Sequence, residues 1–247
     1  MWDPAVYQRY GTERSRPFFD LTTRIGARRP REVVDLGCGF GDLTRTLAER
    51  WPAARITGID SSPEMIAAAT GGDFRVGDIA DWTPGPDTDV VVTNAALQWV
   101  PGHQRMLTRW VRELPAGAWL AMQVPGNFGA PSHRLLREVA AGHGVERGIR
   151  ESPVDEPTVY AESLTAAGAA VDAWETTYVH LLPVDGPDHP VLRWMEGTAL
   201  RPVRAALTAD AWTSFRAELG ARLAEAYPTG HAHVAFPFRR IFVVASI

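Results

Sequence analysis

Along the first half of the chain, short apolar runs typical of buried strands alternate with segments in which apolar residues recur every three to four positions, as in helices. Short β-branched runs predict strands at 33–34, 55–59, 74–76, 90–93 and 119–122. Apolar residues three to four apart predict helices over 43–51, after Pro63 and over 103–113. Strand and helix in alternation, at this rhythm, imply right-handed crossovers and a mainly parallel sheet.

The pattern changes after residue 123. Helices are predicted near 132–142, over 158–167 and over 187–226, an extended segment over 171–181 and a last strand over 240–247. A helical block placed before a terminal strand predicts a cap over one end of the sheet. The fold class predicted is therefore α/β, a seven-stranded mainly parallel sheet with helices on both faces and a helical cap inserted before the last strand.

Two local signals refine the boundaries. The polar and aromatic N-terminal segment predicts a helix over 15–25, and the Ser61-Ser62-Pro63-Glu64 run predicts a capping box. We expect a single domain over 1–247, with 1–31 as a helical lid and 32–125 as the ligand-binding core. Within it, 126–157 and 187–230 are expected to be substrate-cap insertions.

Composition excludes several classes of protein. The 25 basic residues other than histidine are all arginine, and the chain has no lysine. Walker-type nucleotide binding, Schiff-base chemistry and protein-kinase chemistry each need a lysine. One cysteine, no apolar N-terminal leader and no long apolar run favour a cytoplasmic protein. A net charge of -4 gives no electrostatic reason to expect nucleic acid or a membrane as partner.

A glycine loop carries the most chemistry. A buried strand ending in Asp35 leads into Gly37, Gly39 and Gly41, and a helix follows at once. Alternate glycines let the backbone turn tightly and approach a ligand closely. A dinucleotide fingerprint would place glycine at position 42, where this chain has Asp42. A carboxylate beside the loop suits a ligand with an ammonium and a sulfonium better than a pyrophosphate, although NAD remains the competing ligand.

Polar residues follow the next three strands in the same way. Asp60 closes the second strand, where a carboxylate takes both hydroxyls of a ribose. Asp78 and Ile79 follow the third strand and offer a carboxylate for an adenine amine and an apolar surface for its ring. Asn94 ends the fourth strand. The carboxyl ends of parallel strands share one edge, so these residues are predicted to form one site.

The four motifs, in this order, resemble the class I S-adenosylmethionine-dependent methyltransferases, whose fold is Rossmann-like. The resemblance covers about residues 30–125. It rests on Asp35-Leu36-Gly37-Cys38-Gly39-Phe40-Gly41, Gly58-Ile59-Asp60-Ser61-Ser62, Gly77-Asp78-Ile79 and Thr93-Asn94-Ala95-Ala96-Leu97-Gln98-Trp99. It implies S-adenosylmethionine as cofactor, with the ribose on Asp60, the adenine on Asp78 and Ile79, and the methionine part on the glycine loop and Asn94. Asp35 and Ser61 are further cofactor-binding candidates. We add Tyr7 and Arg14 as lid residues over this cofactor.

A closer resemblance extends over nearly the whole chain. The segments Asn94–Val100, Gln123–Phe128, Pro131–His133, Trp194–Pro202 and Phe236–Arg240 are similar to the trans-aconitate 2-methyltransferase family. This resemblance implies a cytoplasmic enzyme that esterifies one carboxylate of trans-aconitate. Residues 143–157 depart from the pattern, and their role stays open.

Acceptor residues are predicted from charge and from the family segments. A tricarboxylate needs cations, and guanidinium suits bidentate carboxylate contacts. Arg201 and Arg239 are the first choices, with Gln98, His133 and Trp194 as further lining residues. Arg204 and Arg240 are predicted to be solvated, and Trp99 and Trp194 are open to a plain core role. Neither a catalytic base nor a metal is expected, because a carboxylate is already ionised near neutral pH.

Two alternatives remain open from the sequence. One is a methyltransferase for another oxygen, nitrogen or carbon acceptor, which would use a base such as His103 or His133. The other is a non-catalytic module that binds the cofactor.

Overall fold

The computed structural model describes residues 11–145, 148–149, 152–230 and 232–247. The chain divides into two compact units. The first, here called the sheet unit, comprises Arg14–Pro125, Val154–Thr176 and Arg240–Ile247. The second, the helical unit, includes Gly126–Pro153 and Thr177–Arg239. The expected lid, core and insertions within one domain stay a prediction.

One seven-stranded sheet has the order β3-β2-β1-β4-β5-β7-β6. Its strands are β1 (Glu32–Leu36), β2 (Arg55–Asp60), β3 (Asp73–Val76), β4 (Thr88–Asn94), β5 (Trp119–Pro125), β6 (Ala170–Pro183) and β7 (His233–Ser246). The first five strands pair in parallel, and β7 pairs antiparallel with β5. The chain order reverses between β1 and β4, so a crevice for ligands is expected at the carboxyl ends of these strands.

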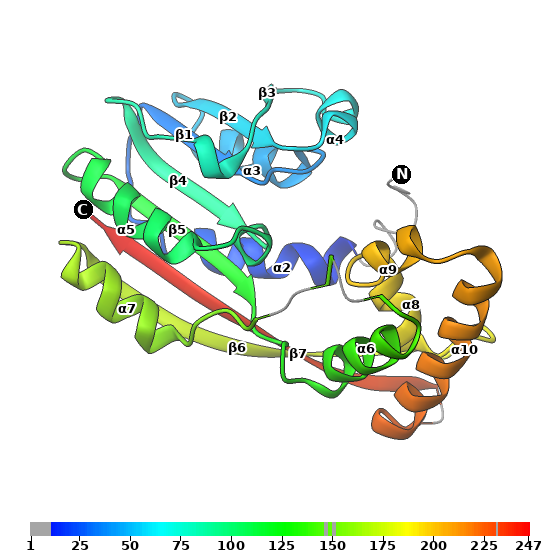
Figure 1. The fold of residues 1–247 in the computed structure, drawn as a ribbon. Helices are drawn as coiled ribbons and strands as arrows, with labels where there is room; N and C mark the ends of the chain where they lie inside the picture. The colour runs from blue at the N-terminus through cyan, green and yellow to red at the C-terminus, as the bar shows by residue number, and fades with distance from the viewer. Residues whose placement is uncertain (1–10, 146–147, 150–151, 231) are drawn as a thin grey trace. The chain divides into compact units, whose positions relative to one another are not determined.

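Helices cover both faces of the sheet unit (Figure 1). They are α2 (Gly11–Thr22), α3 (Asp42–Arg50), α4 (Pro63–Ala68), α5 (His103–Glu113) and α7 (Pro157–Ala166), with short 3₁₀ turns η1 (Ile79–Asp81) and η2 (Leu97–Trp99). Apolar residues of α5 and α7 share one core with Val34, Leu36 and Val91 of the strands. Side chains alternate along a strand, so Val33 and Asp35 face the opposite side, where Asp35 meets Thr44 of α3.

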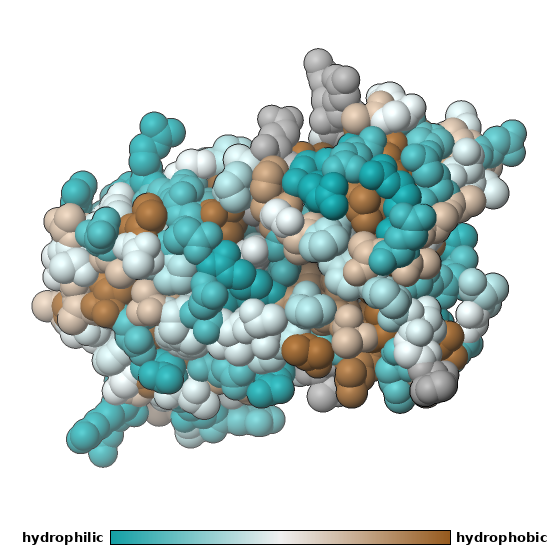
Figure 2. Space-filling view, turned by 90° about the horizontal axis from the view of Figure 1, so that it is seen from below, coloured by the Kyte–Doolittle hydropathy of each residue, from teal (hydrophilic) through white to brown (hydrophobic). Residues whose placement is uncertain are grey.

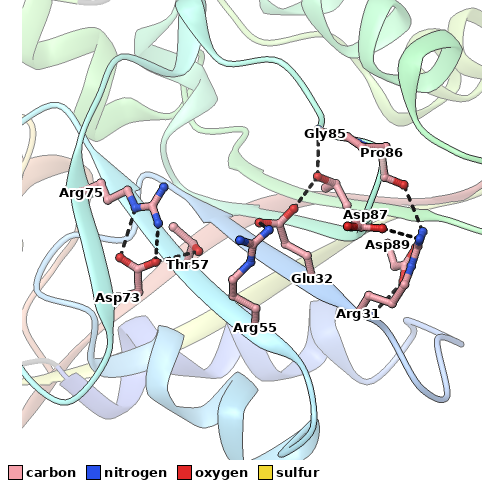
Figure 3. A network of polar contacts seen from close by, with 11 residues as sticks. Arg31, Glu32, Arg55, Thr57, Asp73, Arg75, Gly85, Pro86, Asp87 and Asp89 are labelled. Carbon is pink, nitrogen blue, oxygen red and sulfur yellow. Dashed lines mark hydrogen bonds and ion pairs between the residues drawn. The ribbon is translucent and has the colours of Figure 1, made fainter.

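Ion pairs and hydrogen bonds join the amino ends of the parallel strands (Figure 3). Arg55 Nη2 lies 2.7 Å from Glu32 Oε1, and Glu32 Oε2 accepts a hydrogen bond from Thr88 Oγ1 at 2.9 Å. Arg31 hydrogen-bonds Asp89 at the start of β4 and thereby holds the pKa of that carboxyl below its usual range. These contacts link β1, β2 and β4 at the amino edge, while the glycine loop lies at the carboxyl edge.

The described residues of the helical unit include four helices. They are α6 (Pro131–Gly142), α8 (Pro190–Glu196), α9 (Arg201–Ala206) and α10 (Ala209–Ala226). Their apolar faces pack with the inward side chains of β6 and β7, including Leu182, Phe236 and Phe238. Leu219 and Leu223 of α10 are fully buried in this core, as their helical spacing predicts.

The structure corrects several predicted boundaries. The segment 187–226 is three helices. Pro190 is the first residue of α8, Pro202 is the second residue of α9 and Thr208 is the N-cap of α10, so each lies where a new helix begins. The last strand begins at His233, seven residues before the predicted start at 240. The predicted Ser61–Glu64 capping box is wrong: Ser62 is the N-cap, and its hydroxyl accepts from Met65 N and donates to Glu64 Oε2.

The surface seen in Figure 2 is largely hydrophilic, with hydrophobic residues in small groups. Edge strand β6 contributes exposed apolar side chains at Val179 and Leu181. Within the described ranges, no helix combines the length and hydropathy that crossing a membrane requires.

Candidate functional site

Three glycines of the loop after β1 have positive φ angles, each in a different environment. A Cβ built on Gly37 (φ +81°) would lie 2.3 Å from Cβ of Ala96, and one on Gly41 (φ +76°) would lie 2.2 Å from the Phe74 ring. A Cβ on Gly39 (φ +58°) would meet no atom of the described residues within 4 Å. Gly37 and Gly41 are therefore required by the protein's own packing, whereas Gly39 borders open space that a ligand can enter.

Asp60, the last residue of β2, is tied to this loop. Its Oδ2 accepts a hydrogen bond from Gly39 N at 2.9 Å, and its Oδ1 accepts one from Ser62 N at 2.9 Å. A carboxylate offers about four acceptor positions, so each oxygen keeps capacity for a ligand hydroxyl. Ser61, between the two partners, is exposed. This arrangement fits a ribose diol.

Asp35 is a buried carboxyl group directly before the loop. It accepts a hydrogen bond from Thr44 Oγ1 at 2.6 Å. Burial raises its pKa to about 7, with the Thr44 hydrogen bond acting against the rise and nearby Asp60 adding to it. Asp35 therefore changes charge near neutral pH, and a cationic ligand would favour its ionised form.

Cys38, inside the loop, is a poor nucleophile. Burial, together with the neighbouring Asp35 and Asp60 carboxylates, raises the pKa of its thiol far above its usual range. A Cβ on Gly58 would lie 2.9 Å from Cys38 Sγ, so the thiol is packed against β2.

Asp78 and Ile79 follow β3 as predicted from the sequence. Asp78 is exposed, and its Oδ1 caps η1 by accepting from Ala80 N at 2.8 Å. Ile79 is buried, and its Cδ1 would lie 3.5 Å from a Cβ on Gly37. A carboxylate and an apolar side chain thus lie next to the glycine loop, as an adenine site requires.

The turn after β4 presents two unpaired acceptors. Asn94 Oδ1 and Gln98 Oε1 are buried without a hydrogen-bond partner among the described residues. Gln98 donates through Nε2 to Ala95 O at 2.6 Å, which fixes Oε1 as the unpaired end. Ala95 has φ 56° and donates its N–H to Gln123 O at 2.9 Å. Strained backbone that is held in place beside unpaired buried oxygens is typical of a binding site.

The prediction that Arg240 is solvated is wrong. Arg240 is 6% exposed, and its Nη1 donates to Oε1 of the fully buried Gln123 at 3.3 Å. Gln123 Nε2 has no partner among the residues that the structure describes. The sequence carries no signal for this pair, because only the pairing of β5 with β7 shows which of two adjacent arginines faces inward.

The helical unit positions Arg239 through its backbone. Asn127 is 3% exposed, its Nδ2 donates to Arg239 O at 2.8 Å, and its Oδ1 accepts from Arg239 N at 2.8 Å. Gly126 N also donates to Arg239 O at 3.0 Å. The Asn127 amide therefore continues the ladder between β5 and β7 beyond the end of β5.

Replacing Asn127 with aspartate will destabilise the helical unit by roughly 2 kcal/mol. The variant loses the Nδ2 donor to Arg239 O and places a carboxylate in a buried position. Urea denaturation followed by fluorescence measures the change. Asp188→Asn is the control: it removes a negative charge from a partly exposed position of the same unit, whereas Asn127→Asp adds one at a buried position. Equal stability of Asn127→Asp and the wild type would show that this amide does not hold Arg239.

The other acceptor candidates also lie in the helical unit. Arg201 begins α9 and is half-buried, and desolvation lowers its pKa from the usual value without removing its charge. Ser132 Oγ and His133 Nδ1 are 3.0 Å apart. Trp194 is 3% exposed and stacks on His180 with ring centroids 4.6 Å apart, so it packs in the core of the unit. Arg204 is exposed as predicted, over the Trp212 ring.

His103 and Trp99 are the two remaining residues for which the sequence left a role open. His103 is buried, with its ring nitrogens 3.1 Å from Val100 O and 2.7 Å from Tyr160 Oη. It is a packed histidine and does not suit the role of catalytic base. Trp99 is 50% exposed, so the open possibility that it is a core residue is wrong.

Two predicted lid residues cannot be placed in this site. Tyr7 lies outside the described residues, and Arg14 is described only as part of the α2 backbone. In the described part of the chain, no group of three or more His, Cys, Asp or Glu side chains is arranged to hold a metal ion.

Comparison with known proteins identifies the family. A family model described as a methyltransferase domain matches residues 33–117. The trans-aconitate 2-methyltransferase of Rhodococcus jostii is 54% identical to the chain, and the alignment covers 100% of both proteins. That of Mycobacterium tuberculosis is 51% identical, and the alignment covers 100% of this chain and 97% of the relative. That of Mycolicibacterium gilvum is 54% identical over 100% of this chain and 99% of its own.

Solved structures share the fold at low identity. A putative methyltransferase from an antibiotic biosynthesis pathway of Anabaena variabilis is 15% identical, with a TM-score of 0.58 over 94% of this chain and 97% of that one. A Haloferax volcanii complex of the Trm112 methyltransferase activator with a putative methyltransferase is 20% identical, with a TM-score of 0.56 over 97% and 92%. The full-length identities decide between the methyltransferase and dinucleotide interpretations: the chain belongs to the trans-aconitate 2-methyltransferase family, within the class I S-adenosylmethionine-dependent methyltransferases.

Proposed function

We propose that this protein transfers the methyl group of S-adenosylmethionine to one carboxylate of trans-aconitate, giving the monomethyl ester. The observation that carries the proposal is identity of 51–54% to trans-aconitate 2-methyltransferases over the full length, including the helical unit as well as the glycine loop. A small polycarboxylate is thus the proposed partner, with neither nucleic acid nor a membrane involved. A cytoplasmic location belongs to the same proposal and is supported by the single cysteine.

The residues at the carboxyl edge of the sheet unit fit the cofactor. Asp60 and Ser61 are proposed to hold the ribose, and Asp78 and Ile79 the adenine. The open space at Gly39 admits a ligand against the backbone, with Gly37 and Gly41 shaping the turn. The buried Asn94 oxygen and the Asp35 carboxyl suit the ammonium of the methionine part. When bound, S-adenosylmethionine supplies an electrophilic methyl group on a sulfonium.

The residues themselves need only align and enclose the reactants. An acceptor carboxylate is ionised near neutral pH, so its oxygen attacks without a general base. Alignment of oxygen, carbon and sulfur, with water excluded, lowers the barrier of such a reaction. The buried and doubly engaged His103 agrees with a mechanism that uses no base from α5.

The direct test uses cofactor labelled in its methyl group. Incubation with trans-aconitate followed by mild base releases labelled methanol from an ester, and an N- or C-methylated product releases none. Parallel reactions with cis-aconitate, isocitrate and citrate measure selectivity among related acids. Label that is transferred but not volatile would indicate methylation of a different acceptor atom. Absence of any label transfer with every acid, despite tight cofactor binding, would instead indicate a non-catalytic binding module.

Arg201→Ala will raise the KM for trans-aconitate roughly 10–100-fold, because a hydrogen-bonded charge pair of this kind contributes about 1.5–3 kcal/mol. The KM for S-adenosylmethionine is expected to stay within about twofold. Arg204→Ala, which removes an exposed arginine of the same helix, is the matched control. Equal rises in both KM values would remove Arg201 from the acceptor site.

A further inference from the structure

Arg137 of α6 is a half-buried arginine that meets an aromatic ring instead of a carboxylate. Its guanidinium carbon lies over the Phe128 ring, 3.7 Å from the ring centroid. Among the described residues, none forms a hydrogen bond or an ion pair with it. Burial lowers the pKa of Arg137 from its usual value, although the group stays charged. Arg193 and Arg216 of the same unit are also half-buried, and both pair with carboxylates.

The acid next to Arg137 in the chain, Glu138, is already engaged by other arginines. Its Oε1 lies 2.8 Å from Arg134 Nη1, and its Oε2 pairs with Arg222 of α10. Three arginines therefore share one carboxylate, which leaves a local excess of positive charge in a protein whose net charge is -4. Such an excess attracts an anion.

The contact with Phe128 leaves the donor edge of the Arg137 guanidinium available. The N–H groups of a guanidinium lie in its own plane. A distance of 3.7 Å fits this plane lying flat on the ring, so that the N–H groups point along the ring surface. A planar fork of donors matches the two oxygens of a carboxylate. Because the ring also restricts the side chain, less conformational freedom is lost when an anion binds.

Arg137 lies close to other acceptor candidates of the helical unit. His133 is four residues earlier on α6 and therefore on the same face of the helix. Phe128 directly follows Asn127, whose side-chain amide makes two hydrogen bonds of 2.8 Å with the backbone of Arg239. The guanidinium of Arg137 thus lies near both His133 and the Arg239 backbone.

We propose that Arg137, held by Phe128, binds one carboxylate of the acceptor acid. The inference rests on the proposed function and deepens it. Together with Arg201 and Arg239, it assigns a third arginine to an acid with three carboxylates, so that tricarboxylates are preferred over dicarboxylates. Arg137 contacts the acceptor, whereas Phe128 is a positioning residue that acts through the guanidinium.

Arg137→Gln is the decisive variant, because it removes the charge and keeps a side chain over the ring. Arg137→Lys keeps the charge without the fork. Arg204→Gln is the matched control, since Arg204 also lies over an aromatic ring, that of Trp212, in the same unit. Thermal unfolding shows whether each variant folds, and the lysine variant tests the proposal if the glutamine variant does not fold.

Calorimetry on protein saturated with S-adenosylhomocysteine gives the Kd of trans-aconitate without turnover. Arg137→Gln is expected to raise this Kd roughly 10–100-fold, Arg137→Lys roughly 3–10-fold, and Arg204→Gln by less than about twofold. The Kd of S-adenosylhomocysteine is expected to stay at the wild-type value in all three variants. Phe128→Leu should raise the Kd of trans-aconitate about 2–5-fold, with no further effect once Arg137 is glutamine.

Three dicarboxylates identify the group that Arg137 binds. Itaconate, mesaconate and cis-glutaconate each lack a different carboxylate of trans-aconitate. Arg137→Gln should weaken two of them as strongly as it weakens trans-aconitate. It should weaken the third by less than about twofold, because that acid already lacks the carboxylate in question. Equal weakening of all three would indicate a general effect of charge and would contradict the proposal.

Two further outcomes overturn the proposal: wild-type affinity for trans-aconitate in a folded Arg137→Gln, and equal weakening of trans-aconitate and S-adenosylhomocysteine, which indicates a structural role. Acids that bind, lose affinity in Arg137→Gln and yet are not methylated would remove the proposed function alone. A wild type that binds none of the four acids would remove both.

Discussion

Replacing Gly37 with alanine will destabilise the protein, whereas replacing Gly39 will chiefly abolish ligand binding. At Gly37 a Cβ would lie 2.3 Å from Cβ of Ala96, on a backbone with φ +81°. Overpacking and the left-handed conformation together cost about 3 kcal/mol. For a chain of this size the expected fall in Tm is roughly 6–12 °C.

Gly39→Ala has the opposite profile. Its φ of +58° lies in the left-handed region, which costs about 1 kcal/mol, and its Cβ meets no atom within 4 Å in the described part of the chain. That Cβ enters the space proposed for the ligand, so the Kd of S-adenosylhomocysteine is expected to rise roughly 10–100-fold. Scanning calorimetry and titration calorimetry on both variants separate the two effects. Wild-type affinity in Gly39→Ala would show that the ligand does not contact the backbone there.

Asp35→Asn is expected to stabilise the folded protein at pH 8 and to weaken binding of the cofactor. Burial raises the Asp35 pKa from 3.8 to about 7, so the folded protein binds more protons than the unfolded chain between these values. The stability contributed by this group is fully present below about pH 4 and is lost as pH rises through about 7. The free energy of unfolding of the variant should exceed that of the wild type by on the order of 2–4 kcal/mol at pH 8 and by little at pH 4.

Ligand binding by the same residue has the opposite dependence on pH. An ammonium group favours ionised Asp35, so wild-type affinity for S-adenosylhomocysteine should increase from pH 6 to 8, with proton release. Asp35→Asn should bind weakly and without this slope. Urea denaturation and calorimetry at several pH values measure both effects, with exposed Asp81→Asn as the control. A stability difference independent of pH would contradict the assignment to Asp35.

The sheet and the cofactor edge are predictable from local pattern. The β-branched run 90–93 and the G-x-G-x-G spacing act through backbone sterics and burial that adjacent residues determine. Arg240 is different, since its burial depends on the pairing of β5 with β7 across 117 residues from Gln123. The exposure of Trp99 depends on tertiary packing in the same way. The prolines that divide 187–226 act locally, because proline is favoured in the first turn of a helix, so this division could have been predicted from the sequence.

The glycine roles were likewise only partly visible in the sequence. The three loop glycines look equivalent as a motif, yet two are required by Ala96 and Phe74 from distant strands and loops. Only the folded chain distinguishes a glycine needed for packing from one bordering open space.

The ion-pair network of Figure 3 has a practical consequence for engineering. Stabilising substitutions often impair activity when they rigidify an active site. Here the charged contacts of Arg31, Glu32 and Arg55 lie at one edge of the sheet and the glycine loop lies at the other. Stabilising substitutions can therefore be sought at the amino ends of the strands. Ligand-binding assays, which report on the carboxyl ends, then check independently that function is retained.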